Sequence, residues 1–443
     1  MISKDAVTII RFNMKDAIFS LVFMSLWCFT YFDGLLWFAQ FTLFRRLVIP
    51  TNTSVGLLLF FTFAIIAVKQ KLRVNYMGVV FLILFFYIMI TNIVIVAFFA
   101  APDLSRHLLI AHLFVDPAYY LLISAILLSR WRISESIASK IIIFMGVVSI
   151  VVACAQQLYG YTPLELLILN AAHADNYYFF GATRPSSIFL IPGEYGVFVA
   201  ILFVFSMSFL LKRKQLYAIK IAYVLILCGL MLAEFFAYAR DGILIMLCAS
   251  IFTLVFYYNR SRARVVYAPI AAFCLGFLVY ISAPILSTII HSEIGSVASD
   301  ASVIVRYKEL AAYTGMVFDG GVVHVLFGTG LKQFVYLNRG IYIDNTYLYV
   351  LLQGGIVGLL LWGGAMWGLW KLLYNRAIMA PTPLRVALLS VLAAWPAVAF
   401  FISSQQYLII IFLALTISSQ PLASESIYQL NLLADKSAKR YMT

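Results

Sequence analysis

The sequence predicts an all-α integral membrane protein with about twelve transmembrane helices and a large outer loop between spans 9 and 10. Three observations lead to this prediction: the composition, the length of the apolar segments and the positions of the positive charges. Of 443 residues, 64% are hydrophobic and 11% are charged, whereas a soluble domain has about 25% charged residues. A chain with this composition has too few polar residues to cover its apolar surface in water. We therefore expect lipid to surround it.

Twelve segments are apolar over roughly the length that crosses a hydrocarbon core, which takes about 20 helical residues. The first follows a charged stretch and has no small-residue cleavage site, so it is interpreted as a retained span and not as a signal peptide. Asp33 and Gly34 interrupt its outer half. The predicted spans are 17–43, 55–68, 75–100, 108–129, 138–158, 188–211, 216–238, 242–258, 265–284, 345–370, 386–402 and 405–419.

The positive charges fix the orientation of these spans. If both termini are cytoplasmic, the inner segments carry 22 of the 31 Lys and Arg residues, and each holds at least three. This is the positive-inside pattern, and it predicts a multi-pass protein of a bacterial inner membrane. It also explains the net charge of +13 without a nucleic-acid partner. We expect a single membrane domain over 1–443, with periplasmic loops at 159–187 and 285–344 and function at that face.

Several classes of site are not indicated by any motif. The five cysteines all lie in apolar stretches and form no CxxC pair, which predicts buried thiols and neither a disulfide framework nor a metal site. No G-x-x-x-x-G-K sequence occurs, which argues against ATP as an energy source.

The first outer cluster of polar residues lies where the 159–187 loop leads into the sixth predicted span. It contains Arg184 and Glu194, separated by Pro185, Pro192 and Gly193, which disfavour a regular helix. Irregular backbone at membrane depth is tolerated where it lines a wet cavity. The alternative is a re-entrant turn whose arginine pairs with lipid phosphates.

The second cluster lies in the short link between the seventh and eighth spans. It consists of Arg240, Asp241 and Gly242, and Glu234 precedes it by six residues. An ionisable side chain at this depth is a functional candidate. The alternative is that Arg240 and Asp241 solvate a tight turn.

The third cluster belongs to the 285–344 loop. Residues 303–317 are compatible with an amphipathic helix in which Arg306 and Glu309 pair; the alternative is a solvated loop helix. At the end of the loop, Asp344 or Asn345 is suited to N-cap the tenth span, which continues with Thr346 and Tyr347.

Two further features lie inside predicted spans. His112 and Asp116 are i,i+4 neighbours just before Pro117, which indicates either a satisfied helix kink or a polar group facing a cavity. Gly354 and Gly358 have the small-xxx-small spacing that lets helices approach closely, so packing is the favoured interpretation.

The three clusters, in this order, resemble the O-antigen polymerase and O-antigen ligase superfamily. Residues 184–200 resemble its arginine, proline turn and span, and residues 238–242 its arginine step at a helix end. Residues 306–361 resemble the signature of its large periplasmic loop: an arginine, a Phe-Gly-x-Gly turn at 326–330, an Asp-Asn pair at 344–345 and a glycine-rich span. The resemblance covers about a third of the chain.

The resemblance implies a GT-C-like glycosyltransferase that needs no nucleotide sugar, metal or cofactor. Donor and acceptor would be glycans on undecaprenyl pyrophosphate within the membrane lipids, and the scheme admits a chain-length regulator protein as a partner. Ligases of the family carry a histidine where this chain has Asp344. We therefore favour a polymerase of O-antigen, capsule or exopolysaccharide over a ligase that transfers the glycan to lipid A core.

The expected site follows from the leaving group. Guanidinium groups bind pyrophosphate oxygens bidentately, so Arg184, Arg240 and Arg306 are expected to bind the pyrophosphate. Asp344 or Glu194 is the candidate base in an inverting displacement, and Asn345, Tyr347 and Asp241 are expected to support the site. The alternatives are a lipid-linked oligosaccharide flippase, a peptidoglycan polymerase of the shape and division type, and a membrane scaffold.

Overall fold

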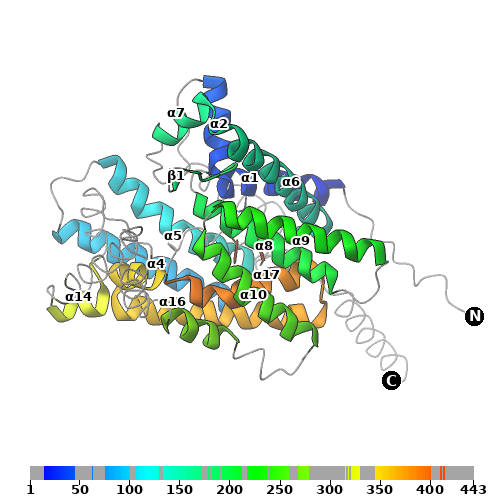
Figure 1. Ribbon diagram of the computed structural model, residues 1–443. Coiled ribbons are helices and arrows are strands. Elements are labelled where there is room, and N and C mark those ends of the chain that lie inside the picture. Colours follow the sequence, from blue (N-terminus) through cyan, green and yellow to red (C-terminus); the bar gives the residue numbers. More distant parts are fainter. Residues whose placement is uncertain are drawn as a thin grey trace, which may run out of the picture.

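The computed structural model is an assembly of long apolar helices that lie side by side (Figure 1). The structure describes residues 14–44, 62, 75–99, 106–128, 133–171, 178–179, 182–189, 192–211, 217–237, 239–258, 268–278, 315, 318, 321–329, 345–400, 410–411 and 413–414. Within them, six helices are long and apolar enough to cross a membrane, or seven if one strongly bent pair counts as a span. The chain is thus an all-α, multi-pass membrane protein, as predicted. The count of twelve stays a prediction, because the segments at 55–68 and 405–419 lie almost wholly outside the described residues.

The helices follow the predicted apolar segments closely. In the N-terminal half they are α1 (Met14–Tyr31), α2 (Asp33–Phe44), α4 (Tyr76–Phe99), α5 (Arg106–Leu128), α6 (Glu135–Tyr159) and α7 (Pro163–Ala171). Two short antiparallel strands, β1 (Tyr178–Phe179) and β2 (Ala182–Thr183), follow. The remaining helices are α8 (Pro192–Leu210), α9 (Tyr217–Ala237), α10 (Arg240–Tyr258), α14 (Gly321–Phe327), α16 (Thr346–Met379) and α17 (Pro383–Val398). Residues 268–278 form a further short apolar helix.

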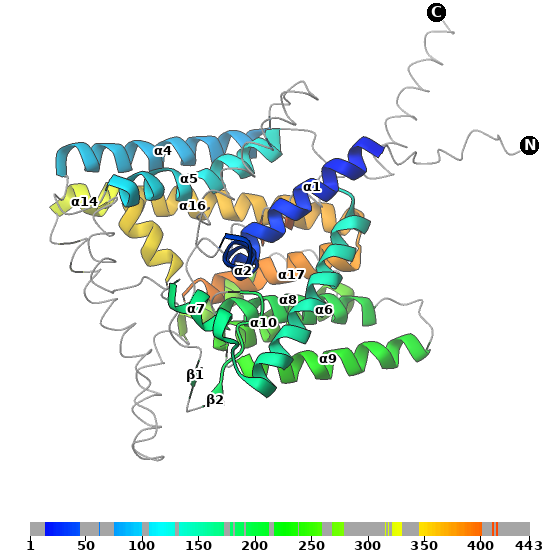
Figure 2. The ribbon, with the colours of Figure 1, turned by 90° about the horizontal axis from the view of Figure 1, so that it is seen from above.

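The helices are arranged in layers around α8. Seen from above, α4 and α5 lie beside α16, α17 comes next, and α8, α10 and α9 complete the bundle (Figure 2). Two thirds of the α8 span is buried, against 11% of the α9 span. α9 therefore borders the bundle and directs Leu225, Leu232 and Phe235 outward, which suits a lipid-facing helix.

The first predicted span is broken where Asp33 and Gly34 interrupt the apolar pattern. α1 and α2 meet at an angle of 93°. A Cβ atom on Gly34 would lie 2.6 Å from the carbonyl oxygen of Ile188, so the absence of a side chain lets the segment 184–189 pack directly against the break. At the same point the ring of Phe32 meets the rings of Phe189 and Phe198 edge to face.

Two predicted helix features have clear outcomes. α5 continues through Pro117, while the side chains of His112 and Asp116 lie outside the described part of the chain. Gly354 and Gly358 both face the ring of Tyr87, whose Cε1 would be 3.2 Å from a Cβ at either position. The close approach of α4 and α16 confirms the packing interpretation of these glycines.

Candidate functional site

The segment 184–189 between β2 and α8 is held in place by side chains from α6. Gln156 is buried in the last turn of α6, and its amide contacts the backbone of Ser187 twice. It accepts from Ser187 N (2.8 Å) and donates to Ser187 O (3.2 Å). Ser187 has a φ of 56°, a left-handed conformation that residues with a Cβ adopt rarely. The hydrogen bonds from Gln156 thus stabilise an unusual turn three residues after Arg184.

Tyr161 holds the start of the same segment. Its hydroxyl donates to the carbonyl of Arg184 (2.6 Å) and accepts from the backbone N–H of Ser186 (3.0 Å). Burial raises the pKa of Tyr161 to about 12, so the hydroxyl stays protonated at neutral pH and the donated bond persists. The backbone around Arg184 is therefore fixed on both sides.

The helix α7 braces this arrangement from outside the bundle. It begins with a capping box: Thr162 N donates to Glu165 Oε2 (2.7 Å) and Glu165 N donates to Thr162 Oγ1 (3.3 Å). The other oxygen of Glu165 accepts from Gln156 Nε2 (2.8 Å). One carboxylate thus caps α7 and orients the glutamine that holds Ser187.

Arg184 joins this segment to the end of α9. Its Nε donates to the carbonyl oxygen of Ala237, the last residue of that helix (2.7 Å). Carbonyls at a helix C-terminus lack intrahelical partners and favour a cation. Arg240 is the first residue of α10, three positions later; its side chain lies outside the described residues. The structure therefore brings the backbone of the second cluster next to the side chain of the first.

Glu234 lies at the centre of this corner between α8, α9 and α10. It is 2% exposed. A Cβ atom on Gly196 of α8 would be 2.9 Å from its Oε1, and one on Gly242 of α10 would be 2.1 Å from the same atom. The two glycines thus create the space for the carboxyl group. Neither of its oxygens has a hydrogen-bond partner among the described residues.

The other acidic candidates lie in the first turns of the flanking helices. Glu194 is in the first turn of α8 and Asp241 in that of α10, both half-buried. The two helices touch one to two residues after these side chains, because a Cβ on Gly242 would be 2.7 Å from the carbonyl oxygen of Gly196. Asp241 and Arg184 both interact electrostatically with Glu234. Three carboxyl groups and Arg184 therefore gather at one corner.

The third cluster is described in part. Asn345 N-caps α16 by accepting from Leu348 N (3.0 Å), which confirms one of the two capping alternatives. Tyr347 donates to the carbonyl of Pro396 (2.9 Å) and packs on Phe400. Tyr347 thus joins α16 to the end of α17. Asp344, Arg306 and the pairing of Arg306 with Glu309 lie outside the described residues and stay predictions.

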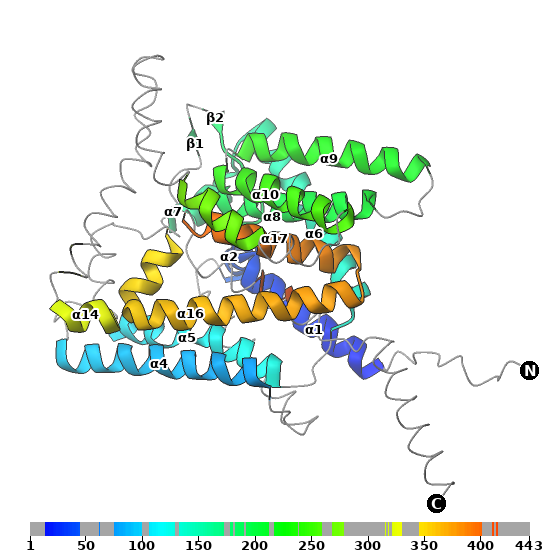
Figure 3. The same ribbon diagram turned by 90° about the horizontal axis from the view of Figure 1, so that it is seen from below.

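All of these elements lie at one end of the bundle. The starts of α8, α10 and α16 and the ends of α9 and α17 come together on the left in Figure 1, and the turned view in Figure 3 agrees. The backbone N–H of Thr346 donates to the carbonyl of Ala399 (2.8 Å) at this end. Clusters far apart in sequence therefore share one end of the molecule.

The turn of the predicted signature at 326–330 contacts a break in α16. Gly355 has φ 65° and ψ −165° inside the helix. Thr329 donates to the carbonyl of Leu352 through its backbone N (2.6 Å) and its hydroxyl (3.1 Å). Tyr87 donates to the carbonyl of Gly354 (2.7 Å). The segments that carry the Phe-Gly-x-Gly turn and the glycine-rich span are thus in direct contact.

Three residues of the corner were not among the predicted site residues: Gln156, Tyr161 and Glu234. A glutamine or glutamate within an apolar span is a signal in itself, because burying a polar group without a purpose is costly. Tyr161 carries no such signal, since interfacial tyrosines are common. In the described part of the chain, no group of three His, Cys, Asp or Glu residues is placed to hold a metal ion.

No family model and no curated protein matches this chain. The fold defines its class: an all-α, multi-pass membrane protein with a polar corner at one end of the bundle.

Proposed function

We propose that this chain polymerises lipid-linked oligosaccharide repeat units of O-antigen, capsule or exopolysaccharide. The growing glycan would pass from undecaprenyl pyrophosphate to the next lipid-linked unit at the periplasmic face of a bacterial inner membrane. The observation that supports this most is the position of Arg184, whose side chain is bonded to the end of α9 three residues before Arg240. Two arginines on adjoining elements suit the two phosphates of the leaving group.

The glycosyl transfer requires few groups besides the two arginines. As the bond from the anomeric carbon to the pyrophosphate breaks, negative charge builds on the leaving oxygen, and fixed guanidinium groups stabilise it. The acceptor hydroxyl needs a weak base, for which Glu194, in the first turn of α8, and Asp344 are candidates. Direct displacement inverts the anomeric centre. Arg306 would add a third positive charge, and Asp241 would help to orient Arg240.

The test is a deletion of the gene in its host, complemented with Arg184→Ala, Arg184→Lys, Arg240→Ala and the wild type. For both alanine variants we expect single repeat units on the lipid anchor, at normal protein level. Removing a group that stabilises the charge of the transition state lowers the rate about 100-fold or more. The lysine variant is expected to restore the ladder only in part, because an ammonium cannot bind bidentately. Lys371→Ala is the matched control, since Lys371 is exposed in the opposite half of α16.

The same gel separates the alternatives. A normal ladder from Arg184→Ala and Arg240→Ala would contradict the binding role of the arginines. Long chains retained on undecaprenyl pyrophosphate, with none on the core, would identify a ligase. Single units that accumulate on the cytoplasmic side would identify a transporter.

The transporter is the second candidate because two spans are discontinuous. Transporter sites are often built from broken helices, and this chain has the 93° bend between α1 and α2 and the break at Gly355 in α16. Both breaks contact other segments of the chain: Gly34 contacts Ile188, and Gly355 contacts Leu326. These contacts favour fixed structural breaks, and so the polymerase.

The proposed orientation has its own test. In a variant without native cysteines, Thr162→Cys is expected to react with a membrane-impermeant thiol reagent added outside. Lys371→Cys is expected to react only after the membrane is opened, because positive loops stay inside. Both positions are exposed, so labelling reports the side of the membrane and not burial. The reverse pattern would overturn the periplasmic placement of the site.

A further inference from the structure

Glu234 is the one carboxyl group of the corner for which the described structure gives no bonding partner. Glu165, near the segment that precedes α8, caps α7 and bonds to Gln156. Glu234 is buried on the last turns of α9, and both of its oxygens are unpaired among the described residues. A buried carboxyl without hydrogen bonds is costly, so its presence at a polar corner calls for a functional explanation.

The surroundings of Glu234 are shaped for this group. Gly196 and Gly242 leave room for the carboxyl, and the Cβ of Ala239 would be 2.1 Å from a Cβ on Gly196. A side chain at either glycine would therefore displace the carboxyl or separate the helices. The space is part of the helix packing and not an accident of one rotamer.

The charged and titratable groups around it come from each adjoining element. Arg184 approaches from the segment before α8, Asp241 from α10, and Tyr195 from α8, and all three interact electrostatically with Glu234. Arg184 is the group proposed to bind the pyrophosphate. A carboxyl beside that arginine lies where an attacking hydroxyl would need a proton acceptor.

Building on the proposed function, we propose that Glu234 binds the acceptor sugar hydroxyl and takes its proton. When the corner opens to water, Glu234 releases its own proton and becomes a carboxylate. The O–H proton of the acceptor then passes to a carboxylate oxygen of Glu234, and the hydroxyl oxygen forms the new bond to the anomeric carbon of the donor. The bond from that carbon to the pyrophosphate breaks, its electron pair stays on the leaving oxygen, and Arg184 stabilises the charge. Glu234 later returns the proton to water.

Two structural consequences follow from this role. The closed corner keeps the carboxyl group out of contact with water when no acceptor is bound. The hydroxyl reaches the carboxyl only when the corner between α9 and α10 opens, so the proposal includes that movement. Glu194 would then be left to orient the acceptor and not to deprotonate it.

The test uses the full chain in proteoliposomes with a lipid-linked repeat unit as substrate. Turnover and KM are measured against pH for the wild type, Glu234→Gln and Glu234→Asp, and the melting temperature is recorded. Glutamine keeps the shape but cannot accept the proton, so we expect turnover to fall about 100-fold or more, with KM little changed. The loss of activity toward acid pH, where the carboxylate becomes protonated, is expected to disappear in Glu234→Gln and to remain in Glu234→Asp.

The outcomes separate this inference from the proposed function. An active wild type with Glu234→Gln within about threefold of its turnover would overturn the role of Glu234 alone, because general-base loss costs far more. An unchanged pH profile in Glu234→Gln would overturn it equally. A wild type that leaves the lipid-linked units unchanged would overturn the proposed function and this inference together. Gly229→Ala on the same helix is the folding control, because nothing lies within 4 Å of a Cβ at that position.

Discussion

Gln156 shows how one side chain can determine the geometry of a site to which it contributes no charge. It lies in the last turn of a largely apolar helix and makes three hydrogen bonds, two to the backbone of Ser187 and one to Glu165. Ser187 in turn donates to the carbonyl of Ser149 (2.5 Å). The left-handed turn that follows Arg184 depends on this set of contacts. Arg184 is thus placed by residues about thirty positions earlier in the chain.

Replacing Gln156 by leucine is expected to lower the free energy of unfolding by about 2 to 4 kcal/mol, because buried donors and acceptors lose their partners. The measurement is denaturant-induced unfolding in detergent, with the glycan ladder as a second readout. Gln157→Leu is the matched control, since the side-chain carbonyl of Gln157 makes no hydrogen bond in the part of the chain that the structure describes. An equal effect of both changes would contradict a specific role for Gln156.

At the scale of the element, α16 combines a break with tight contacts. Its backbone at Gly355 has a combination of φ and ψ that is essentially restricted to glycine. A Cβ there would lie 2.3 Å from the carbonyl carbon and oxygen of Leu326. The break lets α14 dock on α16, and Thr329, just after α14, donates to the carbonyl of Leu352 beside the break. A helix interior thus serves as the attachment point of α14.

Gly355→Ala is therefore expected to destabilise the protein by about 3 kcal/mol or more, through backbone strain and the clash with Leu326. Gly363→Ala in the same helix is the control, because its Cβ would meet nothing within 4 Å. There the change is expected to stay within about 1 kcal/mol. The measurement is thermal unfolding of the two purified variants in parallel. Equal melting temperatures would contradict the proposal that the break at Gly355 requires glycine.

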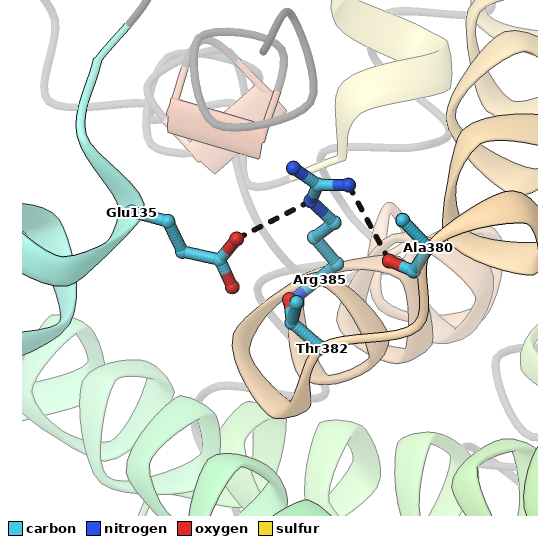
Figure 4. A network of polar contacts seen from close by, with 4 residues as sticks. All are labelled: Glu135, Ala380, Thr382 and Arg385. Atoms are coloured by element: carbon cyan, nitrogen blue, oxygen red, sulfur yellow. Dashed lines mark hydrogen bonds and ion pairs between the residues drawn. The ribbon is translucent and has the colours of Figure 1, made fainter. Parts of the chain in front are cut away.

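At the scale of the whole molecule, the end opposite the corner is joined by an ion pair. Arg385 Nε lies 3.4 Å from Glu135 Oε2, and its Nη1 donates to the carbonyl of Ala380 (3.3 Å), as Figure 4 shows. The pair connects the start of α6 with the start of α17, far apart in sequence. The side chains are 6% and 18% exposed, so water screens them less than a surface pair.

A double-mutant cycle with Glu135→Gln and Arg385→Gln measures this connection. We expect a coupling energy of about 1 to 3 kcal/mol. Each single variant leaves one buried charge without its partner, so the double variant is expected to be less destabilised than the sum of the two single variants. Unfolding in detergent at low and high salt is the measurement. Strictly additive effects would show that the two groups contribute independently.

The sequence by itself determined the class of the protein and the extent of its helices. Composition and apolar segment length are local properties, and lipid forces any spanning segment to bond its own backbone. The helical segments, the break at Asp33 and Gly34 and an N-cap at either Asp344 or Asn345 could thus be predicted from neighbours in the chain. The arginine motifs were recognised in the same way, each within a few residues.

Only the tertiary structure decided which polar residues meet. Glu234, Gly196 and Gly242 lie on three helices, and no periodicity in the sequence relates them. The same holds for Gln156 and Ser187, and for Arg184 and Ala237. Helix packing in a membrane depends on small residues and on the burial of polar groups. Both kinds of contact form between helices that are distant in the sequence, and not between neighbours in one helix. The sequence determines where each helix forms, whereas the corner and its buried carboxyl group arise only when the helices pack.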